Sequence, residues 1–287
     1  MTGAPYATVL VPTHDHSLLI GYALDSIRRQ RFADFELLVV GDGAPPATRE
    51  VVESLACSDP RIRYFDFPKG ARHGEANRHA ALAEARGRIV AYCGDDDLWF
   101  ADHLATIAWL LRRADFAHTT QVDVDADGDL HAHHGAVADR RLRRRMLQEG
   151  YGFFGLSVAG HRLAAYRDLP EGWGPAPVGQ PSDQTMFRKF VARPGLRFAT
   201  GLDVTAIHIS TPLRPGWSAA EREAELRAFH ARLDDPALRH AFRRAIARTR
   251  RHQLSRLARC GWQLATFGQH WAMRFGGTPP RQDARTR

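Results

Sequence analysis

Cysteine is scarce in this sequence, and long apolar runs are absent from it. Cys57, Cys93 and Cys260 lie far apart without C-x-x-C spacing, which supports neither a disulfide framework nor a zinc site. No run of about 18 apolar residues exists, so we expect no membrane-spanning helix. The N-terminus has no basic segment followed by an apolar one, which argues against a secretory signal peptide. These absences predict a cytoplasmic protein.

Acidic residues are outnumbered by basic ones. The 287 residues include 40 Lys and Arg against 32 Asp and Glu, a formal net charge of +8. This excess predicts an anionic partner, which could be a nucleotide, a nucleic acid or a membrane surface. Recognition of nucleic acid has no further support, because no RRM, zinc-finger or helix-turn-helix signature is present.

Strand and helix patterns alternate over the first 114 residues. Short β-branched or alternating runs predict strands at 7–12, 35–43, 61–67 and 88–93. Apolar residues at helical spacing predict helices at 17–30, with Ser17 as N-cap, and at 46–57, 74–87 and 99–114. This order predicts an α/β fold with a Rossmann-like, mainly parallel sheet flanked by helices.

The pattern changes after residue 115. "FAHTTQVDVDADGDLHAHH" predicts two strands joined by a turn, and the following segments predict a basic helix, a strand-like run at 152–160, a helix at 181–195 and two strands within 197–210. From Ser218 to about residue 275 the pattern is helical and basic. We therefore expect a small additional sheet and a helical C-terminal extension.

Polar clusters follow three of the predicted strands: "PTHDH" (12–16), "GDG" (41–43) and "CGDDD" (93–97). The carboxyl ends of parallel strands form the ligand crevice of such a sheet. A single aspartate after a strand is usually a turn or capping residue, but three clusters at one crevice favour binding. A diphosphate with a divalent cation would explain the carboxylates, because hard cations prefer oxygen ligands.

The segments "VLVPTHDHSLLIGYALDSIRRQRFADFELLVVGDG" and "GEANRHAALAEARGRIVAYCGDDDLWFADHL" resemble the family 2 inverting nucleotide-sugar glycosyltransferases, which have the GT-A fold. The resemblance is dense over residues 7–110 and thins out beyond residue 210. It implies that Pro12, Thr13 and His14 line the nucleotide pocket and that Asp42 reads the base.

Further roles are implied by the same resemblance. Arg78 would lie near the nucleotide or phosphates, Asp95 near the ribose, and Asp96 on a Mg²⁺ or Mn²⁺ ion that bridges the diphosphate, while Asp97 and Trp99 complete the "DDxW" pattern. Asp183, in "GQPSDQTMFRKF", would be the general base, and its alternative is a first-turn carboxylate stabilised by the helix dipole.

His208, in "VTAIHIS", would be a further metal ligand or a structural strand histidine. Gly41 and Gly94 depart from the resemblance. They stand where the family's "DDG" and "DxDD" patterns have their first aspartate, which predicts a narrower nucleotide preference.

Other patterns have simpler explanations. "DVDADGDLHAHH" (123–134) begins like a calcium loop, but His134 stands at position twelve and strands flank it, which predicts a hairpin. His131, His133 and His134 are expected to be exposed rather than metal-binding. The basic segments at 140–145 and 243–277 are compatible with an anionic acceptor or membrane surface, and equally with solvated helix faces.

Residues 1–215 are therefore expected to form a GT-A catalytic domain, with a nucleotide-binding half (1–114) and an acceptor half (115–215), followed by a basic helical extension (216–287). The predicted function is metal-dependent, inverting transfer of a sugar from a nucleotide-diphosphate-sugar donor to a hydroxyl of a glycan, a lipid-linked or a small-molecule acceptor. The alternative is a non-catalytic nucleotide-sugar or glycan-binding module. In either case nucleic acid is not expected as a partner, and peripheral membrane contact would involve the C-terminal helix.

Overall fold

The computed structural model describes residues 3–132, 135–209 and 211–257, with side chains as far as residue 248. The strands are β1 (Ala7–Thr13), β2 (Phe35–Asp42), β3 (Ile62–Phe67), β4 (Ile89–Tyr92), β5 (Leu98–Trp99), β6 (Phe116–Val124), β7 (Leu130–His131), β8 (Ala159–Arg162) and β9 (Phe198–His208). The α-helices are α1 (Ile20–Arg28), α2 (Pro46–Ser58), α3 (Glu75–Ala83), α4 (His103–Leu110), α5 (Arg140–Gln148), α6 (Leu163–Arg167), α7 (Ser182–Ala192), α8 (Ala219–His230) and α9 (Pro236–Leu257). Two short 3₁₀ helices are η1 (Leu156–Val158) and η2 (Thr211–Leu213).

A single sheet runs through the molecule, with strand order β3-β2-β1-β4-β8-β6-β9-β5 and with β7 paired to β6. The first four strands in this order are parallel, so β1, β2 and β4 end at the same edge of the sheet. The second half is mixed, because β8 is antiparallel to β4 and β6, whereas β6 and β9 are parallel. The α/β class and the mainly parallel sheet are as predicted. The strands expected to form a small additional sheet instead continue the main one.

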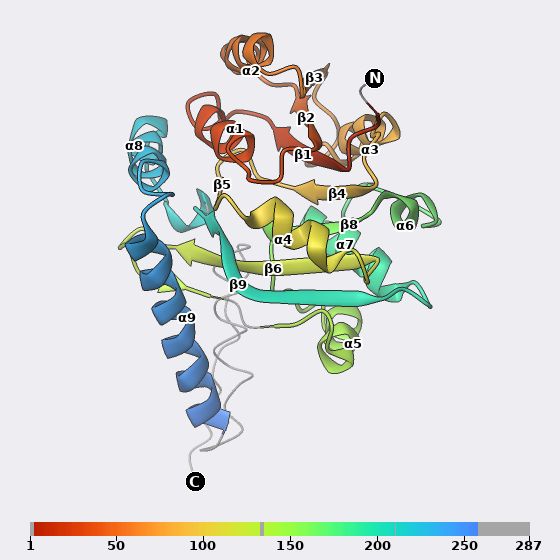
Figure 1. Cartoon of the computed structure of the whole chain (residues 1–287), viewed down its shortest axis with the longest axis vertical. Helices are drawn as coiled ribbons and strands as arrows, with labels where there is room; N and C mark the ends of the chain where they lie inside the picture. Colours follow the sequence, from red (N-terminus) through yellow and green to blue (C-terminus); the bar gives the residue numbers. More distant parts are fainter. Residues whose placement is uncertain (1–2, 133–134, 210, 258–287) are drawn as a thin grey trace.

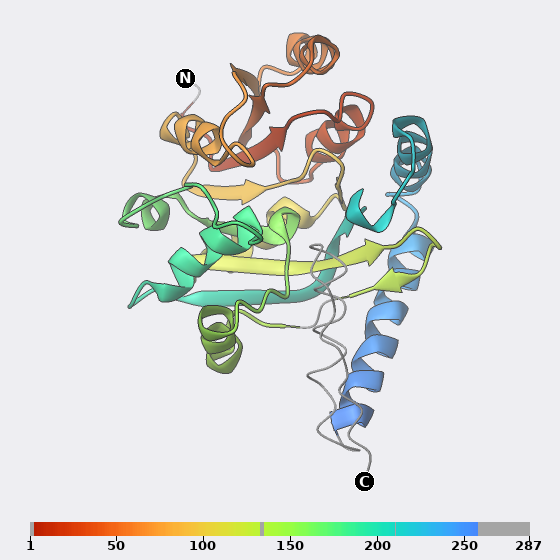
Figure 2. The ribbon, with the colours of Figure 1, turned by 180° about the vertical axis from the view of Figure 1, so that it is seen from behind.

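Helices cover both faces of this sheet (Figures 1 and 2). Successive residues of β8 show how the two faces are filled. A side chain at Gly160 would meet Ile107 of α4, whereas the His161 ring lies 4.7 Å from the ring of Phe190 in α7. Because successive strand residues point to opposite faces, α4 and α7 sandwich the sheet.

The C-terminal helices pack on the edge of this sandwich. Helix α8 lies beside α1, and α9 runs past the ends of β6 and β9 (Figure 1). A second hydrophobic cluster, separate from the main core, holds them there. In this cluster the ring of Phe242 in α9 lies 6.2 Å from the ring of Phe100, and Leu226 of α8 is buried. No helix in the described part of the chain is both long enough and apolar enough to span a bilayer.

Several local predictions need correction. Helix α1 begins at Ile20, and no side chain caps it, so Ser17 is not its N-cap. The strand-like run at 152–160 is irregular over its first four residues, then forms η1, and only its last two residues belong to a strand, β8. The two strands expected within 197–210 are one strand, β9. The segment after Ser218 forms two helices as far as Leu257, and its predicted continuation to residue 275, together with Cys260, lies outside the described residues.

The calcium-like segment is a hairpin, as predicted. Strands β6 and β7 pair across it, and the Asp125 carboxylate accepts the backbone N–H groups of Asp127 and Asp129. His131 Nε2 lies 2.7 Å from Asp125 Oδ2, so this histidine closes the turn. His133 and His134 lie outside the described residues.

Candidate active site

The carboxyl ends of β1, β2 and β4 open into a cleft of about 280 Å³. Six of the residues predicted from the sequence line it: Pro12, Thr13, His14, Asp42, Arg78 and Asp95. The topology explains this convergence, because each polar cluster directly follows a strand of the parallel half. Two buried polar atoms at the cleft, Thr13 Oγ1 and Arg78 Nε, have no hydrogen-bond partner among the described residues.

Asp42 is buried and held on both carboxylate oxygens. Oδ1 accepts the Gly70 N–H at 2.6 Å and the Asn77 side chain at 2.8 Å, and Oδ2 accepts from Lys69 Nζ at 2.6 Å. Burial alone would raise the pKa of Asp42, but the bonds from Lys69, Gly70 and Asn77 outweigh it, so the pKa is lowered. Asp42 therefore contributes a fixed negative charge to the cleft floor.

Gly74 and His14 complete the surroundings of Asp42. Gly74 has φ +71°, and a Cβ there would lie 2.4 Å from Asp42 Cγ, so only glycine fits. His14 Nδ1 donates to the Asp42 carbonyl at 2.7 Å, which ties the β1 loop to the end of β2.

The three consecutive aspartates after β4 have different partners. Asp95 Oδ1 lies 2.9 Å from His16 Nδ1. Asp96 Oδ2 accepts from Arg222 Nη2 at 2.9 Å and from Thr211 Oγ1 at 3.2 Å. The Asp95 carboxylate thus points toward the loop after β1, and the Asp96 carboxylate points toward η2 and α8.

Asp97, the third of these residues, is buried beneath the turn. Its Oδ1 accepts from His208 Nδ1 at 2.8 Å and from the Ile209 N–H at 3.3 Å, and its Oδ2 accepts from Ser157 Oγ. Burial would raise the pKa of Asp97, but the charge and bond of His208 and the bonds of Ser157 and Ile209 lower it. Asp97 is therefore ionised, and its hydrogen bonds hold the turn in place.

Asp96 and His16 have strongly perturbed protonation equilibria. Burial, followed by the charges of Asp97 and Asp95, raises the pKa of Asp96 to about 6, although His16 and His208 oppose this rise. Burial and Arg222 would lower the pKa of His16, but its bond to Asp95 and the carboxylate charges raise the pKa to about 9. A carboxyl group whose pKa is raised by neighbouring carboxylates lies where a cation would be stabilised.

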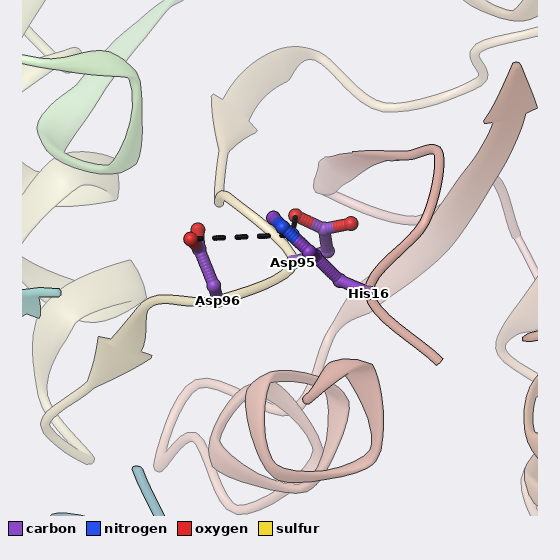
Figure 3. A group of neighbouring side chains, drawn as sticks. All are labelled: His16, Asp95 and Asp96. Atoms are coloured by element: carbon purple, nitrogen blue, oxygen red, sulfur yellow. Dashed lines mark hydrogen bonds and ion pairs between the residues drawn. The ribbon is translucent and has the colours of Figure 1, made fainter. Parts of the chain in front are cut away.

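Figure 3 shows the set of side chains in this region that could hold a metal ion. One ligand atom each from His16, Asp95 and Asp96 can be chosen so that all lie within 4.8 Å of one another. The two carboxylates suit Mn²⁺ or Mg²⁺, and the imidazole is a ligand typical of transition metals, so the residues present fit a divalent cation.

Of the two predicted ligands, Asp96 belongs to this set and His208 does not. The His208 hydrogen bond to Asp97 is nevertheless of the kind that orients a metal-ligating histidine through its other ring nitrogen. Its predicted role as a ligand stays a prediction.

The two unusual glycines lie where other side chains fill the space. A Cβ at Gly41 would lie 2.6 Å from Tyr64 Oη, and one at Gly94 would lie 2.9 Å from Asp97 Oδ2. The Gly94 N–H also donates to Ser157 Oγ at 2.8 Å. Neighbouring side chains therefore occupy the space that an acidic side chain at position 41 or 94 would fill.

Arg78 connects the cleft to the first turn of α7. Its Nη2 donates to the His73 carbonyl at 2.8 Å, its Nη1 donates to Ser182 Oγ at 3.1 Å, and its guanidinium carbon lies 4.8 Å from the centre of the Trp173 ring. Burial lowers the pKa of Arg78, and the charges of Glu75 and Asp183 oppose this shift. The predicted base Asp183 is thus electrostatically coupled to Arg78, although it is not among the residues that line the cleft.

Residues of this site that the sequence did not predict include His16, Ser157 and Arg222. His16 belongs to "PTHDH", where Pro12, Thr13 and His14 received roles, and its place in a polar cluster after a strand was the available signal. Ser157 and Arg222 carry no local motif. Only the packing of η1 and α8 reveals them.

Comparison with known proteins identifies the family of this chain. The model of Glycosyl transferase family 2 matches residues 8–169. The chain belongs to this family. The predicted resemblance is confirmed, and the family segment includes every cleft residue named above as well as Asp96.

Two curated relatives act on lipid-linked sugars, according to their names. The GalNAc(5)-diNAcBac-PP-undecaprenol beta-1,3-glucosyltransferase of Campylobacter jejuni is 33% identical over 103 residues, which are 36% of this chain and 33% of that protein. The UDP-Glc:alpha-D-GlcNAc-diphosphoundecaprenol beta-1,3-glucosyltransferase WfgD of Escherichia coli is 33% identical over 99 residues, 34% of this chain and 37% of its own length. The chain therefore matches about a third of each relative.

Solved structures share the fold. S. aureus TarS 1-349 in complex with UDP-GlcNAc aligns with a TM-score of 0.59 at 18% identity, over 79% of this chain and 66% of that one. The mannosyltransferase PcManGT from Pyrobaculum calidifontis, in complex with GDP-Man and Mn²⁺, aligns with a TM-score of 0.54 at 22% identity, over 94% of this chain and 81% of that one. These alignments confirm the predicted GT-A fold.

Proposed function

We propose that this protein transfers a sugar from a nucleotide-diphosphate-sugar donor to an acceptor hydroxyl with inversion at the anomeric carbon. The observation that carries the proposal is the convergence of Asp42, Arg78 and Asp95 on one cleft of a family 2 chain, beside the cluster of His16, Asp95 and Asp96. In this proposal residues 1–114 bind the nucleotide, residues 115–215 receive the acceptor, and residues 216–287 form the extension.

The donor is proposed to lie across the ends of β1, β2 and β4. Pro12, Thr13 and His14 would flank the nucleotide, Asp42 would face the base, and Asp95 would face the ribose. The orphaned atoms Thr13 Oγ1 and Arg78 Nε support a polar ligand here, because a buried polar group without a partner is destabilising. Arg78 would supply positive charge to the phosphates.

A divalent cation, Mg²⁺ or Mn²⁺, is proposed beside Asp96, with Asp95 and His16 or with His208 as its other protein ligands. When bound, it would neutralise the charge that develops on the departing nucleoside diphosphate. Support comes from the oxygen-rich ligand set and from the Mn²⁺ named in the PcManGT complex.

Asp183 is proposed to accept the proton of the acceptor hydroxyl. The acceptor oxygen then bonds to the anomeric carbon while the bond from that carbon to the diphosphate breaks, and the nucleoside diphosphate leaves. Asp183 stands in the first turn of α7, where its Oδ1 accepts the Gln184 N–H at 2.7 Å, and Arg78 and Arg188 are the nearby positive charges.

A lipid-linked acceptor is proposed from the names of the two relatives and from the charge of this chain. Exposed arginines stand on α5 (Arg140, Arg141 and Arg144) and on α9 (Arg243, Arg244 and Arg248). Such faces suit peripheral contact with anionic lipid at the cytoplasmic surface of a membrane. The donor in this proposal is a UDP-sugar, as named for one of the relatives.

Two variants test the roles of the acids. Asp96→Asn should abolish nucleoside diphosphate release from a panel of UDP- and GDP-sugars with Mn²⁺, while Asp183→Asn should still bind the donor but lose transfer to the acceptor. Asp127→Asn, in the exposed hairpin, is the matched control and should behave as the wild type. Full activity of Asp96→Asn, or of the wild type in excess chelator, would contradict the metal role, and unchanged transfer by Asp183→Asn would remove it as the base.

The alternative is a binding module without catalysis, motivated by Gly41 and Gly94. The same donor panel separates the two functions, because a module that only binds should show a thermal shift with Mn²⁺ and a nucleotide but release no nucleoside diphosphate.

A further inference from the structure

Arg222 reaches the proposed metal site from outside the segment that matches the family. It stands on α8, and its side chain is 10% exposed. Nη2 lies 2.9 Å from Asp96 Oδ2, and Nη1 lies 3.2 Å from His16 Nε2. Arg222 Nε is buried and has no hydrogen-bond partner among the described residues. A guanidinium with an unused donor therefore points into the carboxylate cluster.

Helix α8 holds this arginine firmly. Ser218 and Glu221 form a capping box at its N-terminus, and Leu226 is buried in the second hydrophobic cluster. At the other end His230 Nε2 lies 2.8 Å from Asp25 Oδ2 of α1. Packing at both ends of the helix thus fixes the backbone of Arg222 close to Asp96.

A guanidinium and a divalent cation at the same carboxylate repel each other. In the structure Arg222 contacts two of the three residues that fit a metal ion, Asp96 and His16. A cation that binds alone must therefore enter against the positive charge of Arg222. A diphosphate that enters with it brings negative charge, which can be shared between the metal and the arginine.

We propose that Arg222 binds the donor diphosphate and, without donor, occupies Asp96, so that the divalent cation and the donor bind cooperatively. This inference rests on the proposed function. Arg222 acts here as a second cation of the donor site, contributed by the C-terminal extension. Cooperativity is reciprocal, so the same residue raises the affinity for nucleotide when metal is present.

Binding of Mn²⁺, followed by electron paramagnetic resonance, tests the inference without an activity assay. The nucleotide is whichever of UDP, GDP and dTDP raises the melting temperature most in the presence of Mn²⁺. For the wild type we expect Mn²⁺ to bind at least about tenfold more tightly with nucleotide than without it, within the usual range of coupling between sites. Equal affinity in the two conditions would overturn the inference, and this measurement needs no variant.

Substitutions then locate the effect. Arg222→Gln should bind Mn²⁺ alone about tenfold more tightly and lose most of the coupling, and it should bind nucleotide more weakly at saturating Mn²⁺. Arg222→Lys, which keeps the charge, should restore the weak binding of Mn²⁺ alone. The control is Arg227→Gln on the same helix, whose exposed side chain pairs with Glu223 and should leave all constants unchanged.

The outcomes separate this inference from the proposed function. If Arg222→Gln raises the Mn²⁺ affinity but leaves nucleotide affinity at saturating Mn²⁺ unchanged, Arg222 is only a structural counter-ion and the inference fails. If coupling in Arg222→Gln equals that of the wild type, the inference fails while the metal site stands. If Mn²⁺ binds none of the proteins, the metal part of the proposed function falls, and this inference with it.

Discussion

Replacing Gly94 by aspartate would restore the acid expected from the family pattern, and we predict that it destabilises the protein. A Cβ at position 94 would lie 2.9 Å from Asp97 Oδ2 and 3.4 Å from Asp96 Oδ1. The Asp97 carboxylate cannot swing away freely, because Ser157 and His208 each hold one of its oxygens. Even Gly94→Ala should therefore lower the free energy of unfolding by about 1–3 kcal/mol, the usual range for overpacking.

The charge of the new side chain adds to this steric effect. Two like charges about 4 Å apart repel by about 4 kcal/mol at an effective dielectric constant of 20. The new carboxyl group can avoid the repulsion by remaining protonated, which at pH 7 costs about 4 kcal/mol for a group with an ordinary pKa near 3.9. His16 and Arg222, which contact the neighbouring Asp95 and Asp96, offset part of the repulsion in the ionised form. We therefore expect Gly94→Asp to lower the free energy of unfolding by about 2–4 kcal/mol more than Gly94→Ala does.

Urea unfolding in the presence of a chelator measures these differences, and comparison with alanine cancels the change in backbone freedom that both substitutions share. A carboxyl group whose pKa is raised by folding destabilises the protein at pH values above its unfolded pKa. Its penalty shrinks as the pH falls toward that value. The gap between the two variants should therefore narrow from pH 7 to pH 5. A Gly94→Asp protein as stable as Gly94→Ala at pH 7 would refute the reasoning.

Three further predictions concern stability. Burial lowers the pKa of His118 and of His161 to about 4. Each histidine therefore makes its full contribution to stability above pH 6.5 and loses about 2 kcal/mol of it by pH 5. Urea unfolding should show this loss in the wild type, and His161→Phe should give a flatter profile of unfolding free energy against pH. Gly41→Ala should lower the free energy of unfolding by about 1–3 kcal/mol, because the new methyl group meets the Tyr64 ring, and adding Tyr64→Ala to the same chain should recover part of this loss. Additive losses from the two substitutions would exclude this contact as the cause. Ser218→Ala should lose about 1 kcal/mol from the α8 capping box by the same assay, and an unchanged midpoint would show that packing alone holds this end of the helix.

Local patterns predicted the parallel half of the sheet well. Strands β1, β2 and β3 are each followed by an amphipathic helix, and the period of the apolar residues distinguishes strand from helix. The same logic placed Asp42 and Asp95 at one edge, because parallel strands end together. The aspartates could be assigned to a crevice from the sequence, since topology alone brings them there.

Partners across long stretches of chain could not be predicted. Arg222 lies 126 positions from Asp96 in the sequence, and nothing in its helix distinguishes it from the exposed Arg227. Ser157 belongs to a run that looked like a strand, but it lies in η1, where its hydroxyl faces Asp97. The glycines at 41 and 94 signalled missing acids, whereas their neighbours Tyr64 and Asp97 could be identified only from three-dimensional packing.

The pairing of β5 with β9 has a consequence for the order in which the molecule can be assembled during synthesis. Leu98 and Trp99, directly after the aspartates, pair with Ile207 and Ala206, more than a hundred residues later in the chain. The ribosome therefore releases the acidic turn long before the strand that supports it exists. Contacts so distant in sequence form late and slow the search for the native state. The nucleotide-binding strands can pair early, but the corner that holds Asp97 must wait for His208.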